Sequence, residues 1–171
     1  IALNSYSSGN TNVIRMNSRF ATGNYTGSAP VTEFVKDLVN ITMKKELPSL
    51  FEDPSYTWSG NNYSVNFKFS NSGDLLTFVL PGLYIEEGTS ITASINRKGR
   101  FTANLKSNRL AYRKNYLKNI KSTFDNSNDA LSVKMSSEEI KLASISVKDN
   151  HLTLHGEDDK IGLRFDYDNH S

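Results

Sequence analysis

The chain has 171 residues, of which 37% are hydrophobic, 22% are charged and none is cysteine, and its formal net charge is +2. This composition suffices for one domain with a modest core, and it excludes a disulfide scaffold, a thiolate zinc site and a cysteine nucleophile. A mean hydropathy of −0.49 and the lack of any apolar run near ~18 residues exclude a membrane-spanning helix in this sequence. We expect one domain over residues 1–171.

Short runs of alternating apolar and polar residues, separated by Asn, Ser, Gly and Asp, predict half-buried antiparallel strands in the first half of the chain. In the first run, Ile14, Met16 and Phe20 share one face, and Gly23 ends it. The run over residues 62–70 alternates aromatic or branched residues with polar ones, so it predicts a strand with one buried face.

Two helices are predicted to interrupt the strands. The segment from Pro30 to Glu46 has apolar residues at helical spacing, with Asp37 and several lysines largely on the opposite face. Ser28 is a candidate cap, and Pro48 ends the helix because the residue before a proline avoids the helical region. A second, short helix is predicted over Ser72 to Val79, followed by a Pro-Gly turn.

From Gly88 onward the pattern predicts a strand in about every 8 to 12 residues. A hairpin turns at residues 97–100, and a change of phase around Lys118 and Asn119 predicts a β-bulge. Strands of this kind bury their apolar face against a second layer, close into a barrel or leave it as a trough. The candidate lining of that face comprises Ile91, Ala93, Ile95, Phe101, Ala103, Leu105, Leu110, Tyr112, Leu131, Val133, Met135, Leu152, Leu154, Leu163 and Phe165.

The sequence shows no catalytic or metal-binding constellation. His151 and His155 lie on the strand face opposite Leu152 and Leu154, with their rings too far apart to chelate one ion easily. There is no carboxylate pair in an apolar context, no Gly-rich phosphate loop and no nucleophile elbow. We therefore expect a protein that is not an enzyme and that has no cofactor and no metal site.

One basic block stands out. Between Gly88 and Phe124 there are nine Lys or Arg and no Asp or Glu. Its aromatic residues mostly share the apolar face, whereas most cations take the other face or the turns, so base stacking is not favoured and nucleic acid is not an expected partner. The block predicts a solvated basic face, with an anionic lipid or acidic protein surface as the alternative. Candidate contacts to a headgroup or partner are Lys106, Arg109, Arg113, Lys118 and Lys121.

The order of elements and four stretches of sequence resemble the TamB branch of the AsmA-like envelope proteins, and most closely its Bacteroidetes-type members. The stretches are NSRFATGNYTG at residues 17–27, ELPSLF at 46–51, LLTFVLPGLYIEEGT at 75–89 and LAYRKNYLKNIKSTFD at 110–125.

The resemblance implies a mainly β fold, a curved open antiparallel sheet of β-groove or taco-like shape, here with two short helices packed against it. It implies an internal periplasmic segment of a longer, repetitive Gram-negative protein anchored in the inner membrane. The family is linked to movement of phospholipid between the inner and outer membranes and to translocation and assembly of outer-membrane proteins. The expected partners are phospholipid acyl chains and, through parts outside this sequence, an Omp85-type barrel protein.

Three functional hypotheses follow. In the first, acyl chains lie on the apolar face, where burial is worth roughly 0.8 kcal/mol per methylene. In the second, the chain is a β-sandwich cell-surface module that binds a glycan or protein. In the third, exposed edge strands pair with nascent outer-membrane strands. The sequence leaves open whether the helix at residues 30–46 plugs a groove or braces the sheet from outside.

Overall fold

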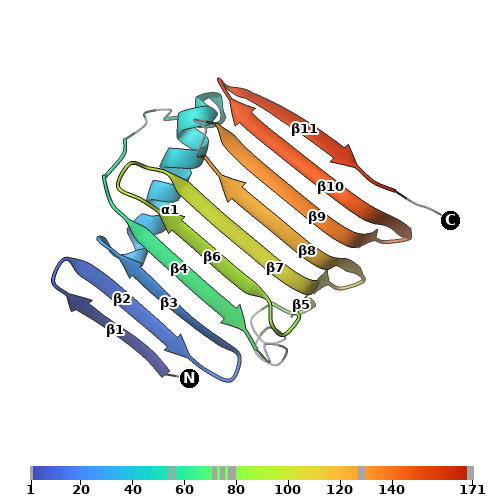
Figure 1. The fold of residues 1–171 in the computed structure, drawn as a ribbon, viewed down its shortest axis with the longest axis horizontal. Coiled ribbons are helices and arrows are strands. Elements are labelled where there is room, and N and C mark those ends of the chain that lie inside the picture. Colours follow the sequence, from blue (N-terminus) through green and yellow to red (C-terminus); the bar gives the residue numbers. More distant parts are fainter. Residues whose placement is uncertain are drawn as a thin grey trace.

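The strands form one open antiparallel sheet. The computed structural model describes residues 2–53, 55, 57–70, 73, 76, 80–126 and 130–168. Within them, all 11 strands belong to the same sheet, with β1 at one edge and β11 at the other (Figure 1). The strands are β1 (Ala2–Ser8), β2 (Thr11–Asn17), β3 (Ala21–Gly27), β4 (Tyr63–Phe69), β5 (Leu83–Ile85), β6 (Ser90–Ile95), β7 (Phe101–Tyr112), β8 (Asn115–Asp125), β9 (Leu131–Leu142), β10 (Ile145–Glu157) and β11 (Lys160–Asp166).

This architecture confirms the mainly β, open antiparallel fold and decides one of the alternatives. The sheet order follows the chain from β1 to β11, except that short β5 pairs with the far end of β7. The predicted hairpin joins β6 and β7, with Ile95 opposite Phe101. Because all strands described in the structure lie in one sheet, a sandwich of two facing sheets is wrong for this part of the chain.

The first predicted run is wrong in its extent. Strand β2 ends at Asn17, and Phe20 lies in the turn before β3 instead of on the strand. Ser18 makes this turn, since its Oγ accepts hydrogen bonds from the backbone N–H of Phe20 at 3.2 Å and of Ala21 at 3.0 Å. Strand β1, whose polar sequence carries no regular alternation, was not predicted.

The predicted long helix is present. It comprises α1 (Val31–Val39) and a π-helical continuation, η1 (Asn40–Lys44), before a short 3-10 turn, η2 (Pro48–Leu50). The helix ends ahead of Pro48 as predicted, but the Ser28 cap is wrong. Ser28 Oγ instead accepts the backbone N–H of Asn62 at 2.9 Å, which fastens the residue to the start of β4. The predicted second helix at Ser72 to Val79 lies largely outside the described residues.

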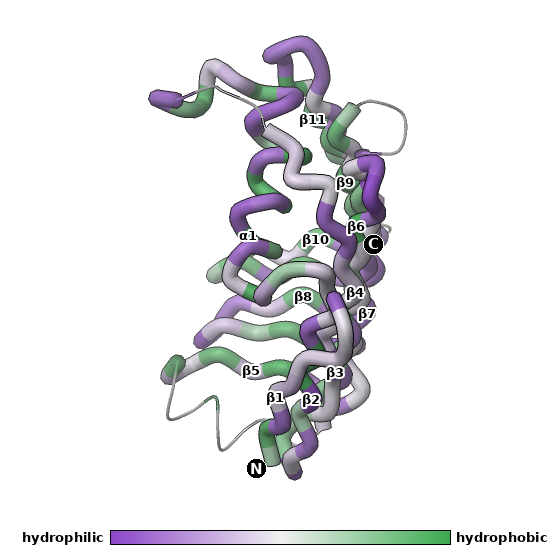
Figure 2. The backbone as a smooth tube through the Cα atoms, turned by 90° about the vertical axis from the view of Figure 1, so that its left-hand side faces the viewer, coloured by the Kyte–Doolittle hydropathy of each residue, from purple (hydrophilic) through white to green (hydrophobic). Residues whose placement is uncertain are grey.

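The helix lies against one face of the sheet, as the side view shows (Figure 2). Ile41 is completely buried and packs in one cluster with Tyr25, Tyr63, Ile95 and Phe101 of the sheet. The helix therefore covers the apolar side of the strands and does not brace the sheet from its other side. No helix in the described part of the chain is both long and apolar enough to cross a membrane.

The phase change predicted near Lys118 and Asn119 has a different cause from an inserted residue. Ser107 pairs with Ile120 and Arg109 pairs with Lys118, so the register is the same on both sides of the irregularity. Asn119 has φ of 50°, in the left-handed region that Asn tolerates. The alternation of side chains changes at Asn119, but neither strand carries an extra residue opposite a single residue of its partner, so the predicted β-bulge is wrong.

The irregularity extends across four strands. Asp149 of β10 also has a left-handed φ, of 47°. It occupies the same transverse line as Asn119, because the registers of β7 to β10 align Asn108, Asn119, Glu138 and Asp149. We call this line the junction row. It divides the long strands into an upper part beside the helix and a lower part that carries β5.

Candidate functional site

The candidate site comprises three transverse rows of side chains on the helix face of the sheet. Directly paired residues of neighbouring strands point to the same face. The inner row, nearest the helix, holds Tyr63, Ile95, Phe101, Leu131, Gly156 and Ile161. The middle row holds Val65, Ala93, Ala103, Phe124, Val133, Leu154 and Leu163. The outer row holds Phe67, Ile91, Leu105, Ser122, Met135, Leu152 and Phe165.

The sequence-predicted lining is thus brought together on one face, with two exceptions. Thirteen of the fifteen predicted residues belong to the three rows. Leu110 and Tyr112 lie beyond the junction row, where they line an apolar hollow of about 240 Å³ with Leu83, Leu117 and Leu142. The apolar surface therefore has a main part beside the helix and a smaller part below the junction row.

From β4 to β7, the inner row belongs to the hydrophobic core and does not line a groove. Ile95 is 1% exposed and Phe101 is 6% exposed, because α1 and η1 cover them. At the other end of the row, Gly156 leaves space for Leu47, whose Cδ1 lies 3.6 Å from the position that a Cβ at residue 156 would take. The predicted lining residues Ile95 and Phe101 consequently have no surface to offer a ligand.

The middle and outer rows remain accessible. Ile91 is 37% exposed and Phe124 is 36% exposed, while Phe165 and Leu163 at the sheet edge reach 44% and 65%. Ala103, Leu105, Val133, Met135, Leu152 and Leu154 are half-buried by their neighbours in the sheet. A face of branched and aromatic side chains runs from β6 to β11 and is only partly covered.

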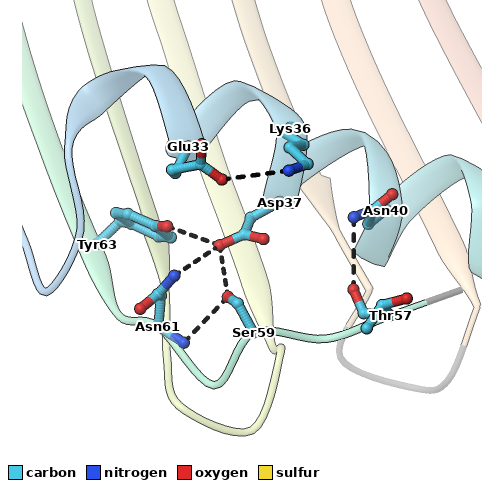
Figure 3. Close-up of polar contacts among 8 residues, drawn as sticks. All are labelled: Glu33, Lys36, Asp37, Asn40, Thr57, Ser59, Asn61 and Tyr63. Atoms are coloured by element: carbon cyan, nitrogen blue, oxygen red, sulfur yellow. Dashed lines mark hydrogen bonds and ion pairs between the residues drawn. The ribbon is translucent and has the colours of Figure 1, made fainter.

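A buried carboxylate holds the helix on this face (Figure 3). Asp37 is 3% exposed, and its Oδ2 accepts hydrogen bonds from Ser59 Oγ at 2.6 Å, Asn61 Nδ2 at 3.1 Å and Tyr63 Oη at 2.6 Å. Burial and the neighbouring Asp37 raise the pKa of Tyr63, since both disfavour a second negative charge. The expectation that Asp37 faces away from the sheet is wrong. The sequence signal for its burial was its position three residues after Phe34, which belongs to the apolar face of the helix.

Two further contacts tie the helix to the sheet, and sequence reasoning missed both. Asn126 Nδ2 donates to the carbonyl oxygens of Ile41 at 3.2 Å and Gly99 at 2.9 Å, and its Oδ1 accepts from the Phe101 N–H at 2.6 Å. At the helix end, the Asp159 N–H donates to the Glu46 carbonyl at 2.9 Å. No periodic pattern marks either residue, because Asn126 lies just after β8 and Asp159 lies in the turn between β10 and β11.

The opposite face of the sheet is polar. One of its rows runs Asn66, Thr92, Asn104, Thr123, Lys134, Thr153 and Arg164. His151 lies on this face as predicted, and His155 contacts Glu157 at 3.1 Å. Among the described residues, no group of three or more His, Asp or Glu could hold a metal ion.

The predicted headgroup contacts are not brought together beside the apolar face. Lys106 and Lys121 pair with each other in the row of His151, on the polar face. Lys118 forms an ion pair with Glu138 at 2.5 Å, which keeps the pKa of that carboxyl below its usual value. Arg109 lies over the ring of Tyr116 at 5.0 Å. Lys118 and Arg109 therefore interact with other side chains of the sheet, and Lys106 and Lys121 point away from the lining.

Arg113 is the exception among the predicted cations. It lies in the turn between β7 and β8, where its N–H donates to the Gly82 carbonyl at 2.7 Å. Its guanidinium lies 5.2 Å from the centre of the Tyr112 ring, beside the small hollow below the junction row. It therefore places a positive charge next to exposed apolar surface.

Comparison with protein-family models, curated proteins and solved structures found no match. The function of the chain is therefore inferred from the chemistry of the sheet. Its helix face has the apolar lining that an acyl chain requires and, on the middle and outer rows, one polar side chain between β4 and β11, that of Ser122. Ser122 Oγ donates to the Lys134 carbonyl, so this hydroxyl needs no water.

Proposed function

We propose that the chain is a non-enzymatic, lipid-handling part of a periplasmic protein of the TamB and AsmA-like type, and that the middle and outer rows hold phospholipid acyl chains. The observation that carries the proposal is an apolar face, built as a single layer, that the helix covers only along the inner row. A ligand of acyl chains needs such a surface and no catalytic group.

The span of the face fits the proposed ligand. From β6 to β11 there are five steps between neighbouring strands, which at about 4.8 Å each give roughly 24 Å. The hydrocarbon of one bilayer leaflet is about 15 Å thick, so an acyl chain lying across the strands fits within the rows. Each methylene that leaves water there contributes roughly 0.8 kcal/mol.

A curved, groove-like sheet within a longer envelope protein belongs to this proposal. The single-layer sheet with two open edges supports it, because such a sheet extends by adding strands without any change to its faces. The same edges support the associated role in assembly of outer-membrane proteins, in which strands add by β-augmentation.

The experiment is native mass spectrometry of the purified chain after incubation with vesicles of phosphatidylethanolamine and phosphatidylglycerol. We expect phospholipid adducts on the unaltered chain and few on I91E or F124E, because each variant places a charge on an exposed position of the apolar face. T92E and T123E are the matched controls, since these neighbours are exposed on the polar face of the same strands.

Circular dichroism and urea unfolding would check that all four variants fold. The proposal fails if the unaltered chain carries no phospholipid, or if the polar-face variants lose as much lipid as the apolar-face variants. Charged substitutions at Ile95 are unsuitable for this test, because that side chain is core.

A further inference from the structure

A shallow hollow on the polar face of the sheet gathers basic and polar side chains from β7 to β10. It has a volume of about 470 Å³ and lies between the junction row and the row of Lys106, Lys121, Ser136 and His151. A second hollow, of about 350 Å³, adjoins it, because both are lined by Lys121, Ser136 and His151, and it adds Lys134. We call the two together the lysine hollow.

Two of its lysines are directly opposite each other. Lys106 of β7 pairs with Lys121 of β8, so their Cβ atoms lie about 5 Å apart on the same face. Lys134 of β9 is the diagonal neighbour of Lys121, at about 7 to 8 Å in such a sheet. Because like charges directly opposite each other destabilise a pair of strands, this arrangement weakens the sheet unless a negative charge lies between the lysines.

The chain itself does not supply that charge. In the part of the chain that the structure describes, none of the three lysines forms an ion pair or a side-chain hydrogen bond. Two nearby carboxylates are engaged elsewhere, since Glu138 is paired with Lys118 and Asp166 is paired with Arg164 at 2.7 Å. Asp149 is the other carboxylate of the lining, and it has no ion pair among the described residues.

The resulting charge fits a phosphate group. Three ammonium groups and one carboxylate leave a charge of about +2, which a phosphate monoester balances with its charge of about −1.5 to −2 at pH 7. A ligand with a single carboxylate would balance only half of it. Lysine ammonium groups are common phosphate ligands in proteins, as point charges that donate to the phosphate oxygens.

Neutral donors border the same space. The hydroxyl of Ser136, an imidazole N–H of His151 and the side-chain amide of Asn108 belong to the lining. Within the described residues, none of these three side chains has a hydrogen bond of its own. Each can therefore donate to a phosphate oxygen without giving up a partner in the sheet.

We propose that the lysine hollow binds the phosphate group of a water-soluble phosphate monoester. Lys106 and Lys121 hold the phosphate between them, and Ser136 and His151 donate to its oxygens. Lys134 contributes its charge from the adjoining part of the hollow. The phosphate relieves the repulsion between the two opposed lysines, which explains why the sheet places them together.

A phospholipid is not the expected source of this phosphate. The lysine hollow and the apolar rows lie on opposite faces of one sheet, so a lipid whose acyl chains lie on the rows does not reach the hollow with its headgroup. A membrane surface is also disfavoured, because the neighbouring row of the polar face, with Asn104, Thr123 and Thr153, has no apolar side chain to enter a bilayer. The site thus goes beyond the proposed lipid binding.

The first test is a titration of the isotope-labelled chain with glycerol 3-phosphate, followed by nuclear magnetic resonance. We expect saturable shifts of the amide signals of Ser136 and His151. K106Q and K121Q should each weaken binding by about fivefold, whereas D149N should tighten it by about threefold. K98Q is the matched control, since it removes the same charge in the turn between β6 and β7, outside the hollow.

The second test is urea unfolding with and without glycerol 3-phosphate. In its absence, K121Q should raise the midpoint, because the substitution removes the repulsion with Lys106. Glycerol 3-phosphate should raise the midpoint of the unaltered chain and leave that of K121Q nearly unchanged. A lysine that only stabilises the sheet would instead lower the midpoint when replaced, with or without the ligand.

The proposal is overturned if sodium chloride at equal ionic strength shifts the same signals as glycerol 3-phosphate does, or if K98Q weakens binding as much as K121Q. Cosedimentation with phosphatidylglycerol vesicles tests the source of the phosphate. Vesicle binding that K106Q and K121Q abolish would assign the hollow to a lipid headgroup and overturn the soluble ligand. None of these variants changes Ile91 or Phe124, so this proposal and the proposed lipid binding fail separately.

Discussion

At the scale of single residues, Asp37 determines how the helix sits on the sheet. It is a buried carboxylate with three hydrogen-bond donors from β4 and the segment before it. Each hydrogen bond to a charged group contributes about 1.5 to 3 kcal/mol to stability, and a buried donor left without an acceptor costs further free energy. One polar residue on an apolar helix face therefore fixes the rotation of α1 and, with it, which row of the sheet is covered.

Replacing Asp37 tests this role. We expect D37A to lower the free energy of unfolding by about 3 kcal/mol, because it leaves Ser59, Asn61 and Tyr63 without their acceptor. Urea unfolding, followed by the fluorescence of Trp58, the single tryptophan, measures the change. K36A is the control, since the exposed Lys36–Glu33 ion pair of 3.6 Å should contribute less than about 0.5 kcal/mol. Equal losses in the two variants would contradict the role of Asp37.

Tyr25 makes the stability of the helix–sheet contact depend on alkaline pH. Burial, and secondarily the charge of Asp37, raise the pKa of Tyr25 from 10.0 to about 12. Because the folded state disfavours the ionised phenol, the contribution of Tyr25 to the free energy of unfolding is fully present below pH 10. It is lost as pH rises through about 12.

We therefore expect the difference in unfolding free energy between the unaltered chain and Y25F to shrink as pH rises from 10 to 12. Below pH 10 the difference includes the hydrogen bond from Tyr25 Oη to the Ala29 carbonyl, of 2.5 Å. Urea titrations at four pH values across this range measure it. A difference that does not change with pH would show that Tyr25 ionises as readily in the folded state as in the unfolded chain.

At the scale of elements, the packing of neighbouring strands distinguishes two glycines. A Cβ on Gly23 of β3 would lie 2.6 Å from the Asn66 carbonyl oxygen and against the Phe67 ring. A Cβ on Gly156 of β10 would lie 3.4 Å from Leu131 Cβ, which is an ordinary contact. Close backbone approach thus requires glycine in β3, whereas Gly156 leaves the space that Leu47 uses.

G23A should lower the free energy of unfolding by about 2 kcal/mol, because β3 and β4 must separate to admit the methyl group. G156A should change it by no more than about 0.5 kcal/mol, and in the stabilising direction, because alanine restricts the unfolded chain. The midpoints of urea unfolding compare the two. A larger loss in G156A than in G23A would contradict the packing of these strands.

The elements also show what the sequence could predict. The period-2 alternation of β4, β6, β7, β9 and β10 and the helical period of residues 30–46 follow from burial of one face, so both were predictable. The turn at Ser18 was not, because it depends on hydrogen bonds from one side chain. The sequence showed the junction row only as a phase change near Asn119. Its extension over four strands depends on the registers between them, which the sequence does not give.

At the scale of the whole molecule, the sequence predicted which residues share the apolar face but not which of them remain accessible. Alternation assigns Ile95 and Ile91 to the same face of β6, yet Ile95 is core and Ile91 is exposed. The difference is set by the position of α1, which Asp37 and Asn126 fix through contacts between distant segments. For the same reason the predicted cations do not assemble, since Lys106 and Lys121 follow the strand parity to the polar face.

The measurement that tests the central proposal most directly is site-specific photocrosslinking to phospholipid. A benzophenone amino acid replaces Ile91, Phe124 or Leu163 on the apolar face, or their neighbours Thr92, Thr123 and Arg164 on the polar face, in the chain incubated with radiolabelled phospholipid vesicles. We predict lipid adducts at the three apolar-face positions and none above background at the three polar-face positions. Equal labelling of both faces, or labelling of neither, would contradict the proposal that acyl chains lie on the middle and outer rows.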